Sequence, residues 1–386
     1  MGSGKTTWAI RYMNDHPKDK FIYITPFLSE CDRVQEQCPS LRFRQPEPEP
    51  TKQASLRRLI RNRQNIVTTH SLLAGLHLDL VDKAMLAREN YTFILDEALE
   101  VVNPIDTLNQ SDIDILMDQF LAPKSEGDIF LRWTQPDNVP GRYEDIKAAV
   151  DAGTLASSQK KALLWILPID LFQSMPNLIV MTFLFEASHL AQYFKVYHVP
   201  YELYHVDHGE LIPDLADLSA AKQRISSLLN IYEGHYNDVG STYNALSATD
   251  WKINPERRKA ALINCRNFFR SACHANAPDC LYSGYKIDGE NPIVRDYRSS
   301  FLVCNCKATN DFSNRHNLGY LPNIFENPAI TRWFTKLGVD YNRDVASLSI
   351  LVQWIWRSAI RNGEAVNVFI PSSRMRNILT AWLHTP

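Results

Sequence analysis

The first residues of the chain have the types and order of a phosphate-binding loop. Gly4, Lys5 and Thr6 fill the last three positions of the pattern G-x-x-x-x-G-K-[ST]. In that pattern backbone N–H groups surround phosphates, the lysine reaches the β- and γ-phosphates and the hydroxyl holds Mg²⁺. The sequence therefore predicts nucleotide binding by Gly2, Ser3, Gly4, Lys5, Thr6 and Thr7. The first glycine of the pattern would lie two residues before Met1, so either the sequence is truncated within the motif or the match is a coincidence.

A strand end further along the chain carries the carboxylates that such a loop needs. Residues 91–98 read Tyr-Thr-Phe-Ile-Leu-Asp-Glu-Ala, an apolar run typical of a buried parallel strand, and ligands gather at the carboxyl ends of such strands. Asp96 is then placed to hold Mg²⁺ together with Thr6, and Glu97 to orient or deprotonate an attacking water. By itself the pattern also fits a strand that ends in two solvated acids. The preceding loop favours the catalytic interpretation.

Length and composition fit an intracellular enzyme with more than one domain. The chain has 386 residues, of which 45% are hydrophobic and 22% charged, and a single core rarely extends over so many residues. It contains neither a run of about 18 apolar residues nor a basic and then apolar signal peptide. The formal net charge is −2, so any nucleic-acid binding must come from local basic surface. None of the seven cysteines shows the C-x₂-C spacing of zinc ribbons.

The pattern of apolar runs predicts alternating strands and helices, which implies parallel sheets covered by helices on both faces. In the first half we expect strands at 20–26, 65–70, 91–98 and 177–182 and helices at 6–14, 28–38, 52–63 and 71–80. Residues 105–174 show few strand signals, so we expect a helical insertion there, with helices at 110–120 and 143–167. In the second half we expect strands at 194–199, 201–206, 301–304 and 365–370 and helices at 219–233, 254–272 and 346–361.

The order of the polar strand ends resembles that of the superfamily 2 helicases, and in particular of phage-type D-E-x-x helicases. The matching segments are residues 2–6 for motif I, 24–28 for motif Ia, 68–71 for the T-x-H segment, 96–99 for the D-E-x-x box, Thr182 for the end of the S-A-T element and 353–361 for motif VI. The resemblance covers nearly the whole chain. It implies an α/β fold of two tandem RecA-like P-loop domains with parallel sheets, at 1–190 and 191–386, with the helical insertion at about 105–174 in the first.

The segment that resembles motif VI carries the positive charge that phosphoryl transfer requires. Negative charge spreads over the γ-phosphate oxygens, and a guanidinium from a second domain can stabilise it. On one continuous helix Gln353, Arg357 and Arg361 would share a face, and the resemblance implies that they form an ATP sensor and arginine finger. A solvated basic stripe fits the same spacing. The family pattern also places the second arginine three residues after the first, where this sequence has Ile360.

Nucleic-acid contacts are predicted at the polar ends of other strands. The resemblance implies that Thr25, Thr69 and His70 contact a strand of nucleic acid and that Thr182 couples this contact to the nucleotide site. Helix capping is an equally good interpretation of both Thr25 and Thr69, and His70 fits a hydrogen-bonded loop histidine. The arginines of residues 57–63 fit either a phosphate contact or a solvated helix face. Residues 305–310 resemble the loop of motif V.

Taken together, these features predict an ATP- and Mg²⁺-dependent helicase or translocase in the cytoplasm of a bacterial or infected cell. The resemblance favours DNA over RNA as the substrate, and it implies partners in phage or prophage replication or recombination, with no membrane. Two alternatives remain open at this stage. One is a P-loop ATPase of another class, such as a DNA-packaging motor. The other is an ATP-binding scaffold that has lost its activity.

Overall fold

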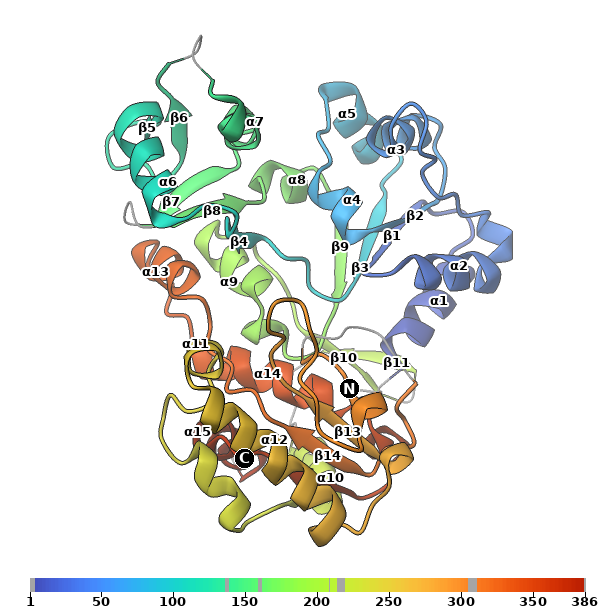
Figure 1. Ribbon diagram of the computed structural model, residues 1–386. Coiled ribbons are helices and arrows are strands. Elements are labelled where there is room, and N and C mark those ends of the chain that lie inside the picture. The colour runs from blue at the N-terminus through green and yellow to red at the C-terminus, as the bar shows by residue number, and fades with distance from the viewer. Residues whose placement is uncertain are drawn as a thin grey trace.

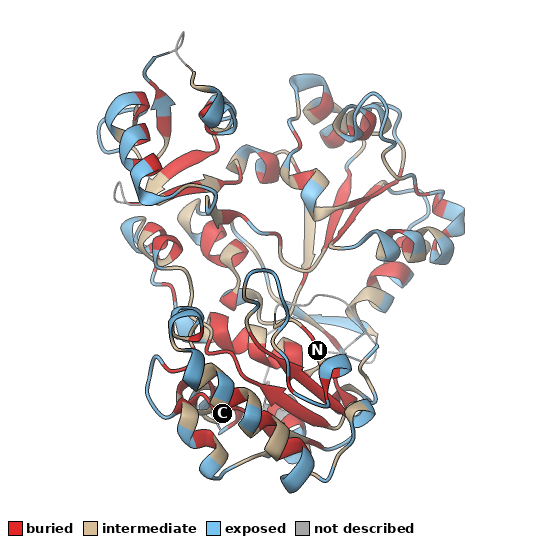
Figure 2. Ribbon diagram, in the orientation of Figure 1, coloured by how far each residue is buried: buried red, intermediate tan, exposed pale blue. Residues whose placement is uncertain are grey.

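Two four-stranded parallel sheets form the framework of the computed structural model, which describes residues 4–135, 139–158, 162–207, 209–213, 219–304 and 311–384 (Figure 1). Buried residues concentrate on the strands of both sheets and on the helix faces turned toward them (Figure 2). Within these residues, no helix combines the length and the apolar character needed to cross a membrane.

The first sheet has the strand order β2–β1–β3–β9, and every neighbouring pair is parallel. Its strands are β1 (Phe21–Thr25), β2 (Ile66–Thr69), β3 (Thr92–Asp96) and β9 (Asn177–Met181). All residues of β1 are buried, as expected of a strand covered on both faces. The accompanying helices are α1 (Lys5–Asp15), α2 (Leu28–Gln37), α3 (Lys52–Arg61), α4 (His70–Ala74) and α5 (Leu80–Arg88). The four strands predicted for this half are therefore confirmed.

The second sheet has the order β12–β15–β14–β13 and is also parallel throughout. Its strands are β12 (Leu229–Ile231), β13 (Cys280–Ser283), β14 (Asn317–Tyr320) and β15 (Val366–Phe369). The helices of this half include α10 (Ser219–Leu228), α11 (Ala248–Ile253), α12 (Pro255–Asn267), α14 (Arg343–Ile355) and α15 (Ser373–His384). Apolar residues of α14 and α15 pack in one core with β14 and β15, and those of α11 and α12 pack in another with β13.

The sequence predicted β15 but missed β12, β13 and β14. The helix expected at 219–233 ends at Leu228, and β12 follows it directly. Phe301, in the strand expected at 301–304, forms only an isolated bridge with Tyr282, so that prediction is wrong. β14 escaped notice because it begins with Asn317 and contains Gly319, and both residue types are depleted in strands. Gly319 is required there, since a Cβ atom at this position would lie 2.5 Å from the Cys265 sulfur.

Residues 102–173 form a mixed subdomain rather than a helical insertion. Its antiparallel sheet has the order β4 (Val102–Pro104), β8 (Ala162–Ile166) and β7 (Leu155–Ser158), and β5 (Leu121–Pro123) pairs with β6 (Leu131–Trp133). Its helices are α6 (Gln110–Ile115), α7 (Glu144–Asp151) and α8 (Ile169–Gln173). The prediction of a helical insertion at about 105–174 is therefore wrong in its secondary structure. The helix expected at 143–167 ends early because Gly153 adopts a φ of 70°, a left-handed conformation that ends helices.

The predicted strand at 194–199 is also wrong, because α9 (His189–Val196) occupies this segment. Leu190, Tyr193 and Phe194 of α9 are buried in the core of the first half, and the predicted domain boundary between residues 190 and 191 falls inside this helix. After α9 the chain forms an antiparallel hairpin of β10 (Tyr204–Asp207) and β11 (Glu210–Pro213).

One helix of the second half packs with the first. α13 (Pro328–Lys336) buries Ala329, Ile330, Trp333 and Phe334 in the same apolar cluster as β3 and β8. Ser158 Oγ at the end of β7 donates a hydrogen bond of 3.1 Å to the Ala329 carbonyl. Figure 1 shows α13 beside the inserted subdomain, apart from the second sheet. The two halves are thus joined by packing on this side of the molecule.

The arginines of α3 are engaged with acidic residues of the same half. Arg57 and Arg61 each donate through Nε to the fully buried carboxylate of Asp82, at 2.6 Å in both cases, and both also bind Asp79. Asp79 and Asp82 form the capping box that begins α5. Arg58 forms an exposed ion pair with Glu47 at 3.0 Å. These arginines therefore join α3 to α5 and to the preceding loop, which favours a structural role over a phosphate contact.

Replacing Asp82 with Ala should destabilise the first half of the chain. The change removes the common acceptor of two guanidinium groups and one side of the capping box, so we expect the free energy of unfolding to fall by roughly 2–4 kcal/mol. Urea unfolding would measure the loss. Glu47→Ala is the matched control, because its exposed ion pair should contribute at most about 1 kcal/mol. Equal effects of the two changes would contradict the structural role assigned to Asp82.

Candidate functional site

Polar residues converge at the carboxyl end of the first sheet. Because its strands are parallel, their carboxyl ends lie at one edge, where α/β proteins bind ligands. The residues brought there are Thr25 at the end of β1, Thr69 at the end of β2, Asp96 and Glu97 at the end of β3, and Thr182 directly after β9. These five residues were predicted as site residues from the sequence, and the structure brings them to the same edge of the sheet.

Glu97 is fixed by the neighbouring strand. Its backbone N–H donates to the Met181 carbonyl at 3.0 Å, and Thr182 Oγ1 donates to its Oε2 at 3.0 Å. Glu97 also has a φ of 79°, a left-handed conformation that costs a non-glycine residue of order 1–3 kcal/mol and that clusters at functional sites. The strained backbone and the threonine together hold the carboxylate at the sheet edge.

Asp96 is partly buried beside Glu97 and accepts a hydrogen bond from a tyrosine. Tyr23 on β1 donates its hydroxyl to Asp96 Oδ2 at 2.9 Å. Burial raises the pKa of Asp96 to about 6, and the negative charge of Glu97 adds to this effect, while the Tyr23 hydrogen bond and the Lys5 charge oppose it. The carboxyl group is therefore easily protonated below neutral pH, and a cation at this position would stabilise its ionised form.

Lys5 approaches the two carboxylates from the start of α1. Burial lowers the pKa of the Lys5 ammonium below its usual range, while the charges of Glu97 and Asp96 act in the opposite direction. Gly4 precedes the helix with a φ of 78°, and within the described residues no side chain caps the helix N-terminus. The first-turn N–H groups, which include those of Thr6 and Thr7, are orphan donors of the kind that bind anions. Gly2 and Ser3 lie outside the described residues.

Thr25, Thr69 and His70 form a second row next to this centre. Thr25 and Thr69 are paired in register between β1 and β2. Neither hydroxyl caps a helix: Phe27 is the N-cap of α2, and Thr69 occupies the N-cap position of α4 without a side-chain bond. His70 Nε2 donates to the Asp96 carbonyl at 3.1 Å. The capping interpretation is therefore wrong for both threonines, and His70 is tied to the strand end that carries Asp96.

The second-half residues do not share one helical face as predicted. α14 ends at Ile355, Arg357 lies in the turn that follows, and Arg361 lies in a separate 3₁₀ turn at Ala359–Asn362. The helix does not continue because Ser358 has an extended backbone, which separates α14 from the next turn. The Ser358 hydroxyl donates a hydrogen bond to the Ile355 carbonyl. Only Gln353 is on α14, where Nε2 donates to Ser349 Oγ at 3.2 Å. The predicted helix 346–361 and its i,i+4 arginine pair are thus wrong. The motif V residues 305–310 lie outside the described part of the chain.

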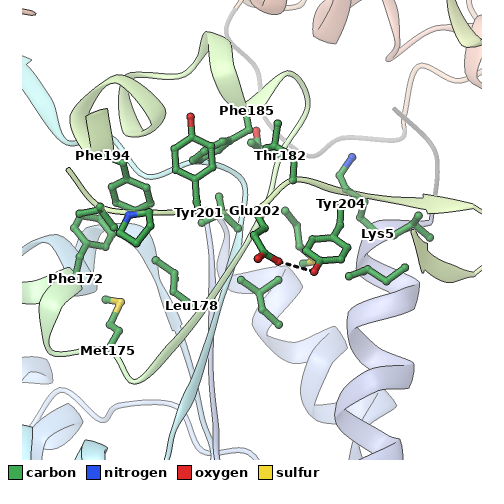
Figure 3. A pocket seen from close by; sticks show the side chains of 18 of the residues that line it. Lys5, Phe172, Met175, Leu178, Thr182, Phe185, Phe194, Tyr201, Glu202 and Tyr204 are labelled. Atoms are coloured by element: carbon green, nitrogen blue, oxygen red, sulfur yellow. Dashed lines mark hydrogen bonds between the residues drawn. The ribbon is translucent and has the colours of Figure 1, made fainter. Parts of the chain in front are cut away.

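Two cavities lie at this edge of the sheet, and Thr182 lines both of them. One, of about 190 Å³, is lined by residues of both halves, among them Glu97 and Thr182 from the first and Ser349 and Gln353 from the second. The other, of about 860 Å³, runs along β9 and is mostly apolar. Figure 3 shows Lys5 and Thr182 at one end of this larger cavity and Phe172 and Met175 at the other. Its volume and its few polar groups are in the range of small-molecule sites.

Comparison with known proteins identifies the family. The chain is 33% identical over 399 residues to the SPbeta prophage-derived uncharacterized protein YonV of Bacillus subtilis (strain 168), and the match covers 99% of this chain and 97% of that protein. In addition, residues 223–383 match the YonV C-terminal Rossmann-like domain.

The chain belongs to the YonV family. The matched C-terminal domain runs from α10 to α15 and contains the whole second sheet together with Gln353, Arg357 and Arg361. Among solved structures, the XPD helicase structure XPD_APO superposes with a TM-score of 0.50 at 14% identity, covering 98% of this chain and 94% of that chain. This likeness concerns the fold, and it confirms the predicted α/β architecture of two tandem RecA-like domains with parallel sheets.

Two contributors to this YonV-family site were missed from the sequence. In the sequence Tyr23 looks like any other aromatic residue of a buried strand. Its hydroxyl reaches Asp96 only because β1 pairs with β3 in this register. His189 begins α9, and its Nε2 lies 2.8 Å from Oε2 of Glu326 in the second half and its Nδ1 3.7 Å from Glu100. It also lines the small cavity with Glu97. A single histidine before an apolar segment carries no signal of such a contact.

The His189 contact should make stability depend on pH. Burial alone would lower the pKa of His189, but hydrogen bonds and charge interactions with Glu100 and Glu326 outweigh it and raise the pKa to about 9. The imidazolium therefore stabilises the folded chain fully below about pH 6.5, its unfolded value, and this stabilisation disappears as pH rises through 9. We expect the difference in unfolding free energy between wild type and His189→Gln to shrink by roughly 3 kcal/mol between pH 6 and pH 10.

Urea unfolding at a series of pH values would measure this difference. His77→Gln is the matched control, because it is the same substitution at an exposed histidine that lies outside this contact. A constant difference for His189→Gln would show that the histidine is not charged in the folded chain.

Proposed function

We propose that this chain is an ATP-dependent nucleic-acid helicase or translocase of the superfamily 2, D-E-x-x type. The observation that carries the proposal is the hydrogen bond from Thr182 to Glu97 at 3.0 Å, next to the partly buried Asp96 and Lys5. This hydrogen bond connects the ends of two strands. One strand ends in the segment that resembles the D-E-x-x box, and the other ends at the residue that resembles the S-A-T element. The fold likeness to an XPD helicase supports the same assignment.

The residues at the sheet edge fit ATP and Mg²⁺. Gly4 leaves open space where a Cβ atom would project, and the uncapped N-terminus of α1 and the Lys5 ammonium provide donors for phosphate oxygens. Mg²⁺ prefers one or two carboxylates together with substrate phosphates and waters, and Asp96 and the Thr6 hydroxyl would supply the protein's share. Bound there, Mg²⁺ would neutralise charge that develops on the phosphates.

Glu97 is the residue proposed to activate water. Its carboxylate is held by Thr182 and faces the small cavity between the two halves, so it can orient a water molecule and accept its proton. Gln353 lines the same cavity from the second half and would sense the nucleotide there. Arg357 and Arg361 remain proposed charge-stabilising residues. They would act from the turns that follow α14 rather than from a helical face.

The nucleic-acid part of the proposal rests on the row of Thr25, Thr69 and His70. Thr25 is fully buried, so Thr69 and His70, which are partly exposed, are the members of this row that a strand would contact directly. His70 contacts the backbone of Asp96. A strand bound along this row would therefore change the position of the Asp96 carboxylate, which is proposed to bind the metal ion. Thr182 would change the position of Glu97. DNA is the proposed substrate, in phage or prophage replication or recombination in the bacterial cytoplasm, as befits a relative of a prophage-derived protein.

Changes at Lys5 and Glu97 should separate binding from hydrolysis. Lys5→Ala removes the phosphate-facing cation and should weaken ATP binding, whereas Glu97→Gln should leave binding in place and lower kcat about 10²- to 10⁴-fold. Calorimetric ATP titration and a phosphate-release assay, each with and without single-stranded DNA, would measure the two effects. Lys18→Ala and Glu36→Gln change exposed residues of the same types and should match wild type.

The outcomes distinguish the alternatives. ATP binding that Lys5→Ala abolishes, combined with no hydrolysis in wild type, would indicate an inactive scaffold. Hydrolysis that single- or double-stranded nucleic acid does not stimulate would indicate a P-loop ATPase of another class. Absence of ATP binding in wild type would refute the nucleotide site itself.

Mg²⁺ binding should depend on pH through Asp96. Because the pKa of Asp96 is raised to about 6, Mg²⁺ must displace a proton in acid, and its affinity in the presence of a nucleotide should fall about tenfold per pH unit below pH 6. Titration calorimetry in two buffers of different ionisation enthalpy would detect the released proton at pH 5.5. Asp96→Asn should bind Mg²⁺ more weakly than wild type and release fewer protons at pH 5.5, because only the terminal phosphate of the nucleotide, which also titrates near pH 6, then loses a proton. Affinity of the wild type that stays constant down to pH 5 would exclude Asp96 as a ligand.

A further inference from the structure

A basic pocket lies on α13 and at the start of α14, outside the site described above. It has a volume of about 400 Å³ and is lined by Pro328, Thr331, Arg332, Thr335, Lys336 and Arg343. Half of these lining residues are cations and none is acidic, so the pocket carries a concentrated positive charge in a chain whose formal net charge is −2. An anionic ligand is the one that such a pocket attracts.

The three cations are not neutralised within the described part of the chain. Arg332, Lys336 and Arg343 make no side-chain hydrogen bond or ion pair there, in contrast to the arginines of α3, which pair with Asp79 and Asp82. Nε of Arg332 is buried without a hydrogen-bond partner. The side chains of Arg332, Lys336 and Arg343 therefore offer an anionic ligand donors that no acidic partner occupies.

The arrangement of the cations suits phosphate groups. Arg332 and Lys336 are four residues apart on α13 and therefore lie on one face. Arg343 is the first residue of α14, where the helix dipole adds positive potential. The threonine hydroxyls are already engaged with the backbone of α13, Thr335 Oγ1 donating to the Thr331 carbonyl at 2.9 Å. The guanidinium and ammonium groups are thus the available donors, and guanidinium groups bind phosphate oxygens in a bidentate manner.

We propose that this pocket binds phosphate groups of a single-stranded nucleic-acid backbone. The inference rests on the proposed function, which requires a local basic surface. The pocket is such a surface, and the sequence alone did not indicate it. The pocket is also connected to the nucleotide site: Arg343 and Gln353 lie on the same helix, about 15 Å apart along its axis. A strand held at the start of α14 therefore contacts the rigid element that carries Gln353 into the cavity shared with Glu97.

The test is the salt dependence of binding by the full chain carrying Arg332→Gln, Lys336→Gln and Arg343→Gln together. Fluorescence anisotropy with a labelled oligothymidylate, over a series of NaCl concentrations, gives both affinity and slope. Each phosphate contact adds about 0.7 to the slope of log affinity against log salt for single strands. We expect the variant to lose about tenfold or more in affinity at low salt and to reduce the slope by about 2.

A matched control has the same change in charge elsewhere. Lys252→Gln, Lys259→Gln and Lys286→Gln alter three exposed lysines of the second half and should leave affinity and slope close to wild type. ATP binding should be equal in both triple variants and wild type, which verifies that the Lys5 site and the fold are intact. Inorganic tripolyphosphate and polyglutamate serve as competing anions in parallel titrations.

Several results would overturn the proposal. If the pocket variant binds oligothymidylate with the affinity and slope of wild type, the pocket is not a nucleic-acid contact, and the proposed function stands. Tripolyphosphate or polyglutamate binding that the pocket variant abolishes, with DNA binding unchanged, would assign the pocket to free phosphates or to an acidic protein instead. If wild type binds ATP but no oligothymidylate, both this pocket and the nucleic-acid part of the proposed function are refuted.

Discussion

Two adjacent carboxylates at the end of a buried strand set the conditions for the rest of the structure. Burying an ionised group without partners is expensive, and Asp96 and Glu97 would also repel each other. Each is compensated from a different element: Tyr23 and the charge of Lys5 act on Asp96, and Thr182 binds Glu97. These partners come from α1, β1 and the end of β9. The sheet order β2–β1–β3–β9 is what brings them to β3.

The second half of the chain is held beside these carboxylates by packing contacts that lie outside the candidate catalytic residues. α13 lies in the core of the first half, and Glu326, just before it, holds His189 of α9 together with the hydroxyl of Tyr341 at 2.8 Å. From there α14 runs along the cavity that contains Glu97. One side of the interface is thus anchored by an apolar core and a partly buried ionic contact, and the other side is lined by Gln353.

The sequence predicted what depends on local pattern. The buried strands of the first sheet could be recognised from their continuous apolar runs, and the polar residues at their ends followed from the geometry of parallel sheets. Predictions failed where distant contacts decide the structure. Gly153 ended a helix whose pattern continued, α14 ended at Ile355 before it reached Arg357, and β14 formed around Asn317 and Gly319 because neighbouring strands fix it. Tyr23 and His189 gained their contacts only from residues far away in the chain, which no local pattern records.

The unpaired edge of β9 has a consequence for the behaviour of the protein in solution. In the described residues β9 is hydrogen-bonded to β3 on one side only, and the larger cavity lies along its residues Leu178 to Thr182. An open edge beside this mostly apolar cavity is a template for extended segments of other molecules. Self-association that increases with protein concentration is the expected liability, and crowding in the cell would act on the same edge.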